Sequence, residues 1–179
     1  METDALLWIH DRATPALDGA FILSNLLGLW WFCIVVVAAV TAWQLRRGER
    51  RAALAWVALG VVVWALPELI KAAVARPRPA LWPALVDAPG LSFPSAHAVA
   101  SAALYPVLGW MVARCCGGRT GAGYGLGVVV ALFVGLGRLY LGVHWPSDVL
   151  AGWALGLVLS ALGVLRLKKL SAPEPDAGV

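Results

Sequence analysis

Long apolar runs dominate this chain and restrict what it can fold into. They cover about residues 19–45, 52–70, 98–112, 122–136 and 149–167. A helix crosses a bilayer with about 20 mostly apolar residues, and inside the bilayer every backbone N–H and C=O must be satisfied within helices or a closed barrel. Hydrophobic residues make up 61% of the 179 residues and charged residues only 13%, which excludes an ordinary soluble domain. We therefore predict an all-α polytopic membrane bundle with about five spans, or six.

The segments between the runs are expected to lie at the membrane surface. Residues 4–18 mix apolar side chains with four charged ones and are too short to span, so we predict an interfacial helix there. Residues 76–94 contain five prolines, which predicts a loop. Pro106 lies inside the third run and is expected to be tolerated as a kink. Residues 1–170 would then form one membrane-embedded domain, and residues 171–179 are predicted to be a disordered tail.

The basic residues are distributed unevenly between the two ends of the predicted spans. One end receives nine of them: Arg46, Arg47, Arg50, Arg51, Arg114, Arg119, Arg166, Lys168 and Lys169. The other end receives five: Arg12, Lys71, Arg76, Arg78 and Arg138. Cytoplasmic segments carry an excess of Lys and Arg, so the first end and the C-terminus are predicted to be cytoplasmic. Because the net charge of +4 is spread over these short segments, we expect no nucleic-acid partner.

Residues 137–148, GRLYLGVHWPSD, hold three ionisable side chains in an otherwise apolar region: Arg138, His144 and Asp148. Each such group costs about 2.5–3.5 kcal/mol at the bilayer centre, so the cluster indicates a functional site. Proline favours the first position of a helix; Pro146 is therefore predicted to begin one, with Asp148 in its first turn. Asp148 could then accept a hydrogen bond from one ring nitrogen of His144 and leave the other basic. The helix N-terminus and the Arg138 guanidinium both favour phosphate.

The predicted topology brings two further polar segments to the same, extracytoplasmic end. Residues 71–79 read KAAVARPRP, and residues 93–97 read FPSAH. Together with residues 137–148 they resemble the three-part signature of the type 2 phosphatidic acid phosphatase family, the lipid phosphate phosphatases: K-x6-R-P, P-S-G-H and S-R-x5-H-x3-D. All spacings agree over about residues 60–165. Two positions differ, since Ala96 stands where the family usually has glycine and Gly137 where it usually has serine.

The resemblance implies a metal-independent phosphatase without a cofactor. In that family pattern His144 attacks phosphorus and becomes a phosphohistidine, and Asp148 orients it. His97 would protonate the leaving oxygen. The equatorial oxygens would be held by the remaining signature residues, namely Lys71, Arg78, Ser95 and Arg138. Fixed cations and N–H groups of this kind stabilise the charge on a transferring phosphoryl group.

The substrate implied is a lipid phosphate in the surrounding membrane. An outward-facing site suits undecaprenyl diphosphate, which we expect first, with phosphatidate or phosphatidylglycerophosphate as the alternative. A catalytically weak lipid-binding or assembly protein with the same fold is the alternative of another class. A transporter lacks support because no pair of broken spans lies in inverted halves. Near the signature, Glu68 is expected to pair with Lys71 one turn away, and Arg76 is interpreted as a membrane-interface anchor.

Overall fold

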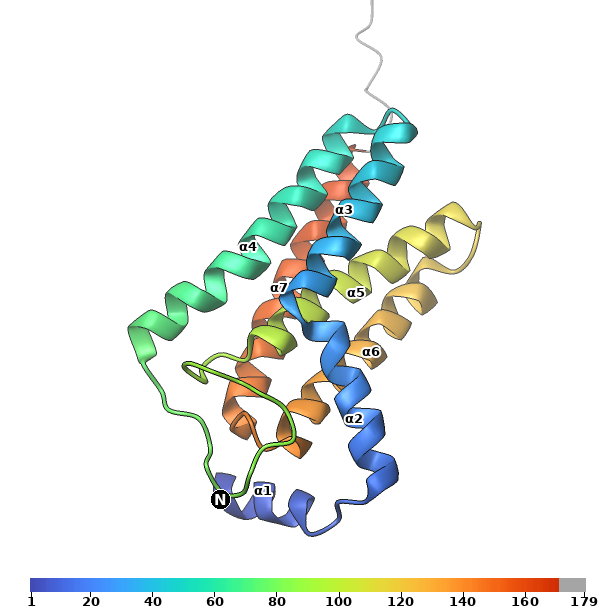
Figure 1. The fold of residues 1–179 in the computed structure, drawn as a ribbon. Coiled ribbons are helices and arrows are strands. Elements are labelled where there is room, and N and C mark those ends of the chain that lie inside the picture. Colours follow the sequence, from blue (N-terminus) through green and yellow to red (C-terminus); the bar gives the residue numbers. More distant parts are fainter. Residues whose placement is uncertain (171–179) are drawn as a thin grey trace, which may run out of the picture.

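The computed structural model describes residues 1–170 as seven α-helices and no strand (Figure 1). The helices are α1 (Glu2–His10), α2 (Pro15–Gly28), α3 (Trp30–Arg46), α4 (Arg50–Val74), α5 (Ala96–Cys115), α6 (Thr120–Tyr140) and α7 (Pro146–Leu170). The all-α class is therefore confirmed. The tail predicted over residues 171–179 lies outside the described residues.

Four helices, α4 to α7, are long and apolar enough to cross a membrane. The consecutive helices α2 and α3 pass the same test only together, and they are bent by 54° at the break between them. Counting that pair as one span gives the expected number of five. Many large apolar side chains of these helices are exposed, such as Leu54, Trp64 and Leu126, as lipid contact requires.

The first apolar run differs from the expectation, because it forms two helices rather than one continuous helix. Leu29 adopts an extended conformation (φ −66°, ψ 138°) and separates α2 from α3. The helix-terminal carbonyl of Leu27 finds a partner outside the helix, since it accepts a hydrogen bond of 2.6 Å from the Tyr105 hydroxyl. The expected interfacial segment is also shorter: α1 ends at His10, and α2 begins at Pro15 behind the N-cap Thr14, whose side chain accepts from Leu17 N.

Helix α5 lies at the centre of the bundle, and most of its residues are buried. It approaches α6 closely because glycines face each other: a Cβ built on Gly109 or on Gly123 would lie closer than 3.0 Å to the carbonyl of the other. Small residues allow such backbone contact between membrane helices. Pro106 lies inside α5, which continues past it to Cys115, so the expected tolerance of this proline is confirmed.

The helix ends gather at two levels of the bundle. In Figure 1 the ends of α4 and α6 and the starts of α5 and α7 lie toward one end, together with α1 and the loop of residues 75–95. The α3–α4 turn, the α5–α6 turn and the end of α7 lie toward the other end. The three signature segments thus meet at the first end, as the order of the spans predicted.

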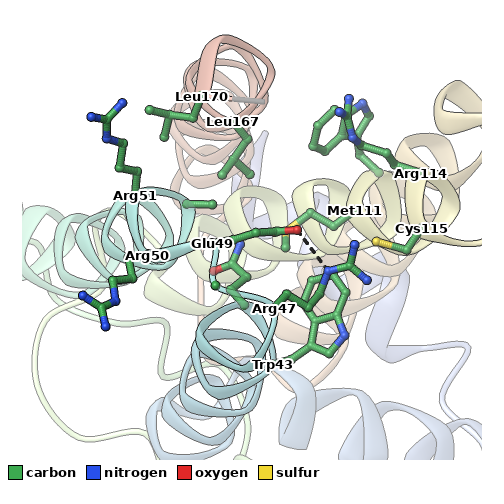
Figure 2. Close-up of a pocket in the computed structure, with 14 residues that line it drawn as sticks. Trp43, Arg47, Glu49, Arg50, Arg51, Met111, Arg114, Cys115, Leu167 and Leu170 are labelled. Atoms are coloured by element: carbon green, nitrogen blue, oxygen red, sulfur yellow. Dashed lines mark hydrogen bonds and ion pairs between the residues drawn. The ribbon is translucent and has the colours of Figure 1, made fainter. Parts of the chain in front are cut away.

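A cavity of about 720 Å³ lies at the other end, between the α3–α4 turn and the ends of α5 and α7 (Figure 2). Its lining includes Arg47, Arg114 and Trp110 but none of the signature residues. Arg47 is paired with Glu49 at 3.0 Å and lies over the Trp43 ring. The cavity therefore belongs to the basic end of the bundle and is separate from the signature residues.

Candidate active site

The start of α7 fixes the position of the Asp148 carboxylate. The carbonyl of Trp145 accepts from the backbone N–H groups of Asp148 (3.0 Å) and Val149 (3.3 Å), so Trp145 acts as the N-cap. Asp148 is then the third helical residue, and its Oδ2 accepts from Trp145 N at 2.8 Å. This is the backward half of a capping box. The prediction that Pro146 begins a helix with Asp148 in its first turn is confirmed.

His144 lies between Asp148 and Arg78. Its Nδ1 is 3.4 Å from Asp148 Oδ2, and its Nε2 is 3.0 Å from Arg78 Nη1. A guanidinium can only donate, so Nε2 must accept and carry the lone pair, which leaves the proton on Nδ1 facing the carboxylate. Both His144 and Asp148 are buried. The neighbours of the ring thus select the tautomer that has a nucleophilic Nε2.

The charge of His144 follows from its surroundings in the loop between α6 and α7. Burial lowers the pKa of this histidine to about 4. The hydrogen bond to Asp148 acts in the opposite direction, and the positive charges of Arg138 and Arg78 lower the pKa further. The imidazole is therefore neutral at neutral pH, the state in which Nε2 can attack.

The loop of residues 75–95 holds the Arg78 guanidinium over His144. Nη1 of Arg78 also donates to Val143 O at 2.8 Å, and Nε donates to Gly90 O at 3.1 Å. Burial lowers the pKa of Arg78, whereas the charge of Asp148 raises it. A second cavity of about 540 Å³ lies beside this guanidinium and is lined by loop residues that include Asp87. Arg78 is thus held by hydrogen bonds and also lines the cavity.

Arg76 is part of the site, and its interpretation as a membrane-interface anchor was wrong. Its Nη1 donates to Asp148 Oδ1 at 2.8 Å and to Ser147 Oγ at 2.6 Å. Its Nη2 is 2.6 Å from Glu2 Oε2. One signal for this was present in the sequence: Arg76 lies only two residues from Arg78, which belongs to the signature.

Helix α1 reaches the site through Glu2, which sequence reasoning missed. Glu2 Oε1 accepts from Ser147 N at 2.9 Å and from Ser147 Oγ at 2.8 Å. Burial raises the pKa of Glu2, but hydrogen bonds from Ser147 and Arg76 outweigh it and lower the pKa below its usual value. The dipole of α7 also stabilises the negative charge of Glu2, because this carboxylate lies at the N-terminus of that helix. Glu2, Arg76, Asp148 and His144 therefore form one chain of polar contacts.

The start of α5 contributes Ser95 and His97. Ser95 is the N-cap, its Oγ lies 3.5 Å from Ala98 N, and its own N–H donates to Asp148 O at 3.1 Å, which ties α5 to α7. His97 Nε2 is buried and has no hydrogen-bond partner within residues 1–170. The charges of Lys71, Arg78 and Arg138 are close enough to act on its ring. The Ser95 oxygen thus accepts in the cap while its O–H can still donate, and His97 also has a nitrogen to offer.

The last two predicted cations come from α4 and α6. Lys71 is paired with Glu68 at 2.6 Å, as expected one turn apart. Arg138 is almost completely buried, and its Nη1 contacts Asn25 Oδ1 of α2. Arg138 Nε has no hydrogen-bond partner among the described residues. All seven predicted site residues therefore lie at the same end of the bundle, and Arg76, Glu2 and Asn25 join them.

The comparisons with known proteins agree with the signature. The sequence profile of the PAP2 superfamily matches residues 51–171. Phosphatidylglycerophosphatase B of Bacillus subtilis is 37% identical over 97 residues, which cover 52% of this chain and 47% of that protein. Decaprenylphosphoryl-5-phosphoribose phosphatase of Mycobacterium tuberculosis is 37% identical over 139 residues, which cover 74% of this chain and 68% of that protein. The chain thus spans about half to two thirds of the length of these relatives.

A solved structure shows the same fold. The crystal structure of the transmembrane PAP2-type phosphatidylglycerolphosphate phosphatase of Bacillus subtilis superposes with a TM-score of 0.83 at 28% identity, over 92% of this chain and 83% of the other. The family resemblance found in the three signature segments is therefore confirmed. From its profile match, its helix arrangement and its relatives, this chain belongs to the PAP2 superfamily and is a membrane-embedded homologue of its lipid phosphatases.

Proposed function

We propose that this protein hydrolyses a lipid phosphate through a phosphohistidine on His144, without a metal ion. The observation that carries the proposal is the hydrogen bond of 3.0 Å between Arg78 Nη1 and His144 Nε2. It places a cation on the lone pair that would attack, and this guanidinium would pass its hydrogen bond to the oxygens of the phosphorus when substrate binds. Positioned cations at developing charge are a main source of phosphoryl-transfer catalysis.

In the first step His144 Nε2 attacks phosphorus, and the bond between phosphorus and the lipid oxygen breaks. His97 donates a proton to that oxygen, so the lipid leaves as a neutral alcohol when the substrate is a monoester. The proton on His144 Nδ1 stays in place and faces Asp148 Oδ2, which stabilises the positive charge that forms on the ring. Arg78, Arg138 and Lys71 would hold the remaining phosphoryl oxygens.

In the second step a water molecule attacks the phosphohistidine. His97, now neutral, takes a proton from that water, and the bond between phosphorus and Nε2 breaks. Inorganic phosphate leaves, His97 is again protonated and His144 is again neutral. The same histidine therefore acts as acid in one step and as base in the other, as a two-step displacement requires.

Metal independence is supported by the donors that the site offers. Within residues 1–170, no three His, Cys, Asp or Glu side chains cluster in a way that could hold a metal ion. The charge neutralisation that a metal would supply falls to the arginines and Lys71. We accordingly propose activity in the presence of a chelator.

We propose a phosphomonoester lipid as the preferred substrate. Among the described residues, four fixed cations, the protonated His97 and three carboxylates surround the site, which leaves two positive charges: Lys71, Arg76, Arg78, Arg138 and His97 against Glu2, Glu68 and Asp148. The cavity beside Arg78 adds a further acid, Asp87, and the described residues that line it include no second cation. This balance suits the dianion of a monoester better than a diphosphate, which carries more negative charge. Undecaprenyl diphosphate, expected first from the sequence, becomes the second candidate, supported by a site predicted to face outward.

The reaction class is tested with His144→Ala, with His10→Ala as the matched control. His10 stacks on Trp82 at a centroid distance of 4.1 Å and is not among the residues that we assign to the reaction. We expect His144→Ala to lose phosphate release from phosphatidylglycerophosphate with chelator present. Rapid quench should find acid-labile phosphate on the wild-type protein and on His10→Ala but not on His144→Ala. Normal turnover in His144→Ala, or activity that a chelator removes, would overturn the mechanism.

The substrate is tested by comparing kcat/KM for three purified lipids: phosphatidylglycerophosphate, phosphatidate and undecaprenyl diphosphate. We expect a monoester to exceed the diphosphate by tenfold or more, which corresponds to about 1.4 kcal/mol of transition-state preference. The opposite ranking would make undecaprenyl diphosphate the substrate and leave the reaction class intact.

We also propose that the site faces the extracytoplasmic side, with the C-terminus in the cytoplasm. The support is the excess of Lys and Arg at the opposite end of the spans. We further propose that residues 1–170 act as one catalytic domain, because α1 and α2, outside the matched profile, supply Glu2 and Asn25 to the site.

A further inference from the structure

Helix α2 lies against the active site although it precedes the part of the chain that the family profile matches. Three of its residues, Ser24, Asn25 and Gly28, contact signature positions on α6 and α5. Positions 24, 25 and 28 share one face of a helix, because residues four apart are neighbours. This face of α2 therefore covers Gly137, Arg138 and His97 at the same time.

The departure at Gly137 is explained by this contact. A Cβ built on Gly137 would lie closer than 3.0 Å to the hydroxyl oxygen of Ser24, a distance that real Cβ atoms do not show. The serine that the family usually has at this position would meet the same obstacle. Ser24 is completely buried, and its hydroxyl donates to Phe21 O at 2.7 Å, so it has little freedom to give way. The absence of a side chain at Gly137 thus allows α2 to approach α6 closely.

A second close contact involves Gly28, one turn after Ser24 in α2. A Cβ built on Gly28 would lie closer than 3.0 Å to the ring of His97. Both ends of this face of α2 are therefore in contact with the signature residues, and Asn25 is held between them.

Asn25 contacts Arg138, a signature cation that is almost completely buried and has no carboxylate partner among the described residues. Its Oδ1 accepts from Arg138 Nη1, and no other hydrogen bond to this guanidinium is found among the described residues. A neutral amide orients the guanidinium and leaves its full positive charge, in contrast to Lys71 and Arg76, which face Glu68 and Asp148. The donors that remain on Arg138, Nε among them, are then directed away from Asn25 and available to an oxyanion.

We propose that Asn25 is a positioning residue of the phosphate site, and that the Gly137–Ser24 contact is what brings it there. Asn25 holds the Arg138 guanidinium in one orientation without neutralising it. This inference rests on the proposed function in that Arg138 is taken to bind the phosphoryl group. It assigns a role to α2, a helix outside the three signature segments.

The first test compares Asn25→Ala with Asn25→Asp by two readouts. One is kcat/KM for phosphatidylglycerophosphate, and the other is the rise in the thermal unfolding temperature in detergent caused by inorganic phosphate, which reports binding without turnover. In Asn25→Ala we expect kcat/KM to fall about 10-fold to 100-fold, as loss of a hydrogen bond to a charged group implies. In Asn25→Asp we expect the phosphate-induced rise to be smaller than in Asn25→Ala, because the carboxylate neutralises Arg138.

The comparison separates positioning from simple packing. A structural role alone would predict that Asn25→Asp, which keeps the shape and strengthens the contact to Arg138, binds phosphate at least as well as Asn25→Ala. That result, or wild-type kcat/KM in Asn25→Ala, would overturn the proposal. The phosphate-induced stabilisation does not depend on a phosphohistidine, so a failure of the mechanism at His144 and a failure of this inference remain distinguishable.

The second test addresses the Gly137–Ser24 contact. We expect Gly137→Ser to lose at least tenfold in kcat/KM, because the new side chain pushes α2 and Asn25 away from Arg138. The double variant Ser24→Gly with Gly137→Ser makes room again and should recover most of that loss. Gly125→Ser in the same helix is the control, since a Cβ built there meets nothing within 4 Å. Full activity in Gly137→Ser, or no recovery in a folded double variant, would contradict the assigned contact.

Discussion

Arg76 Nη1 lies 2.8 Å from Oδ1 of Asp148, the carboxylate whose Oδ2 faces His144 Nδ1. One carboxylate thus serves a histidine with one oxygen and an arginine with the other. Arg76 neutralises part of the charge that Asp148 would otherwise direct at the imidazole, and Glu2 in turn holds Arg76. Through this chain of contacts the N-terminal helix influences the basicity of the residue that we assign as nucleophile.

Arg76→Gln should therefore change the reaction as well as the packing. Without the guanidinium the charge of Asp148 acts more strongly on His144, so the pKa of His144 rises and the acid limb of the pH–rate profile moves to higher pH. Loss of a hydrogen bond to a charged group implies a fall in kcat of about 10-fold to 100-fold. Steady-state kinetics across pH would measure both effects.

The control for Arg76→Gln is Arg12→Gln, because Arg12 is exposed and its guanidinium donates to Trp8 O outside the site. We expect Arg12→Gln to keep the wild-type profile. A lower kcat in Arg76→Gln with an unmoved acid limb would show that Arg76 acts on structure only.

The pH dependence of kcat/KM tests the state of His144 directly. Attack requires the neutral ring, and the lowered pKa of about 4 means that the ring becomes protonated only below that pH. We expect no loss from this group between pH 7 and pH 5, and a fall of about tenfold per pH unit well below pH 4. An acid limb near 6.5, the ordinary pKa of histidine, would contradict the buried environment described for His144.

The packing of α5 on α6 predicts a stability difference between two neighbouring glycines. Gly123→Val should destabilise the folded protein by about 1–3 kcal/mol, since its Cβ would meet the backbone of Gly109. Gly125→Val is the matched control two residues away, because a Cβ built there meets nothing within 4 Å. Thermal unfolding in detergent would measure the difference. Equal unfolding temperatures for the two variants would argue against the close helix contact.

The sidedness that we propose can be tested with cysteines that the chain already contains. Ala84 is exposed in the loop over the site, whereas Cys115 and Cys116 are exposed at the opposite end of α5. In intact cells an impermeant maleimide should label Ala84→Cys beyond the level of the unsubstituted protein. Labelling of Cys115 and Cys116 should require opening of the cytoplasmic face. Reversed accessibility would invert the topology and leave the reaction unchanged.

The helical class, most of the approximate span boundaries and the seven candidate site residues could be predicted from the amino-acid sequence. The helical class follows from the length of the apolar runs, and the His144–Asp148 pair from Pro146 and a fixed spacing. The other site residues follow from the resemblance of three short segments to the family signature. The order of the spans then brought three separate segments to one end, because successive membrane helices alternate in direction.

The additional residues that contact the site could be found only from the packed bundle. Arg76 is 72 residues from Asp148, Glu2 is 74 residues from Arg76, and Asn25 is 113 residues from Arg138. No local pattern specifies such pairs, since they depend on how closely two helices approach. That approach is set by steric contact, as at Gly137 against Ser24, and by the break at Leu29, which lets α2 leave the direction of α3 and lie over the site. An apolar run indicates that a segment enters the membrane. Where that segment bends, and which helix it packs against, depend on the packing of the whole bundle.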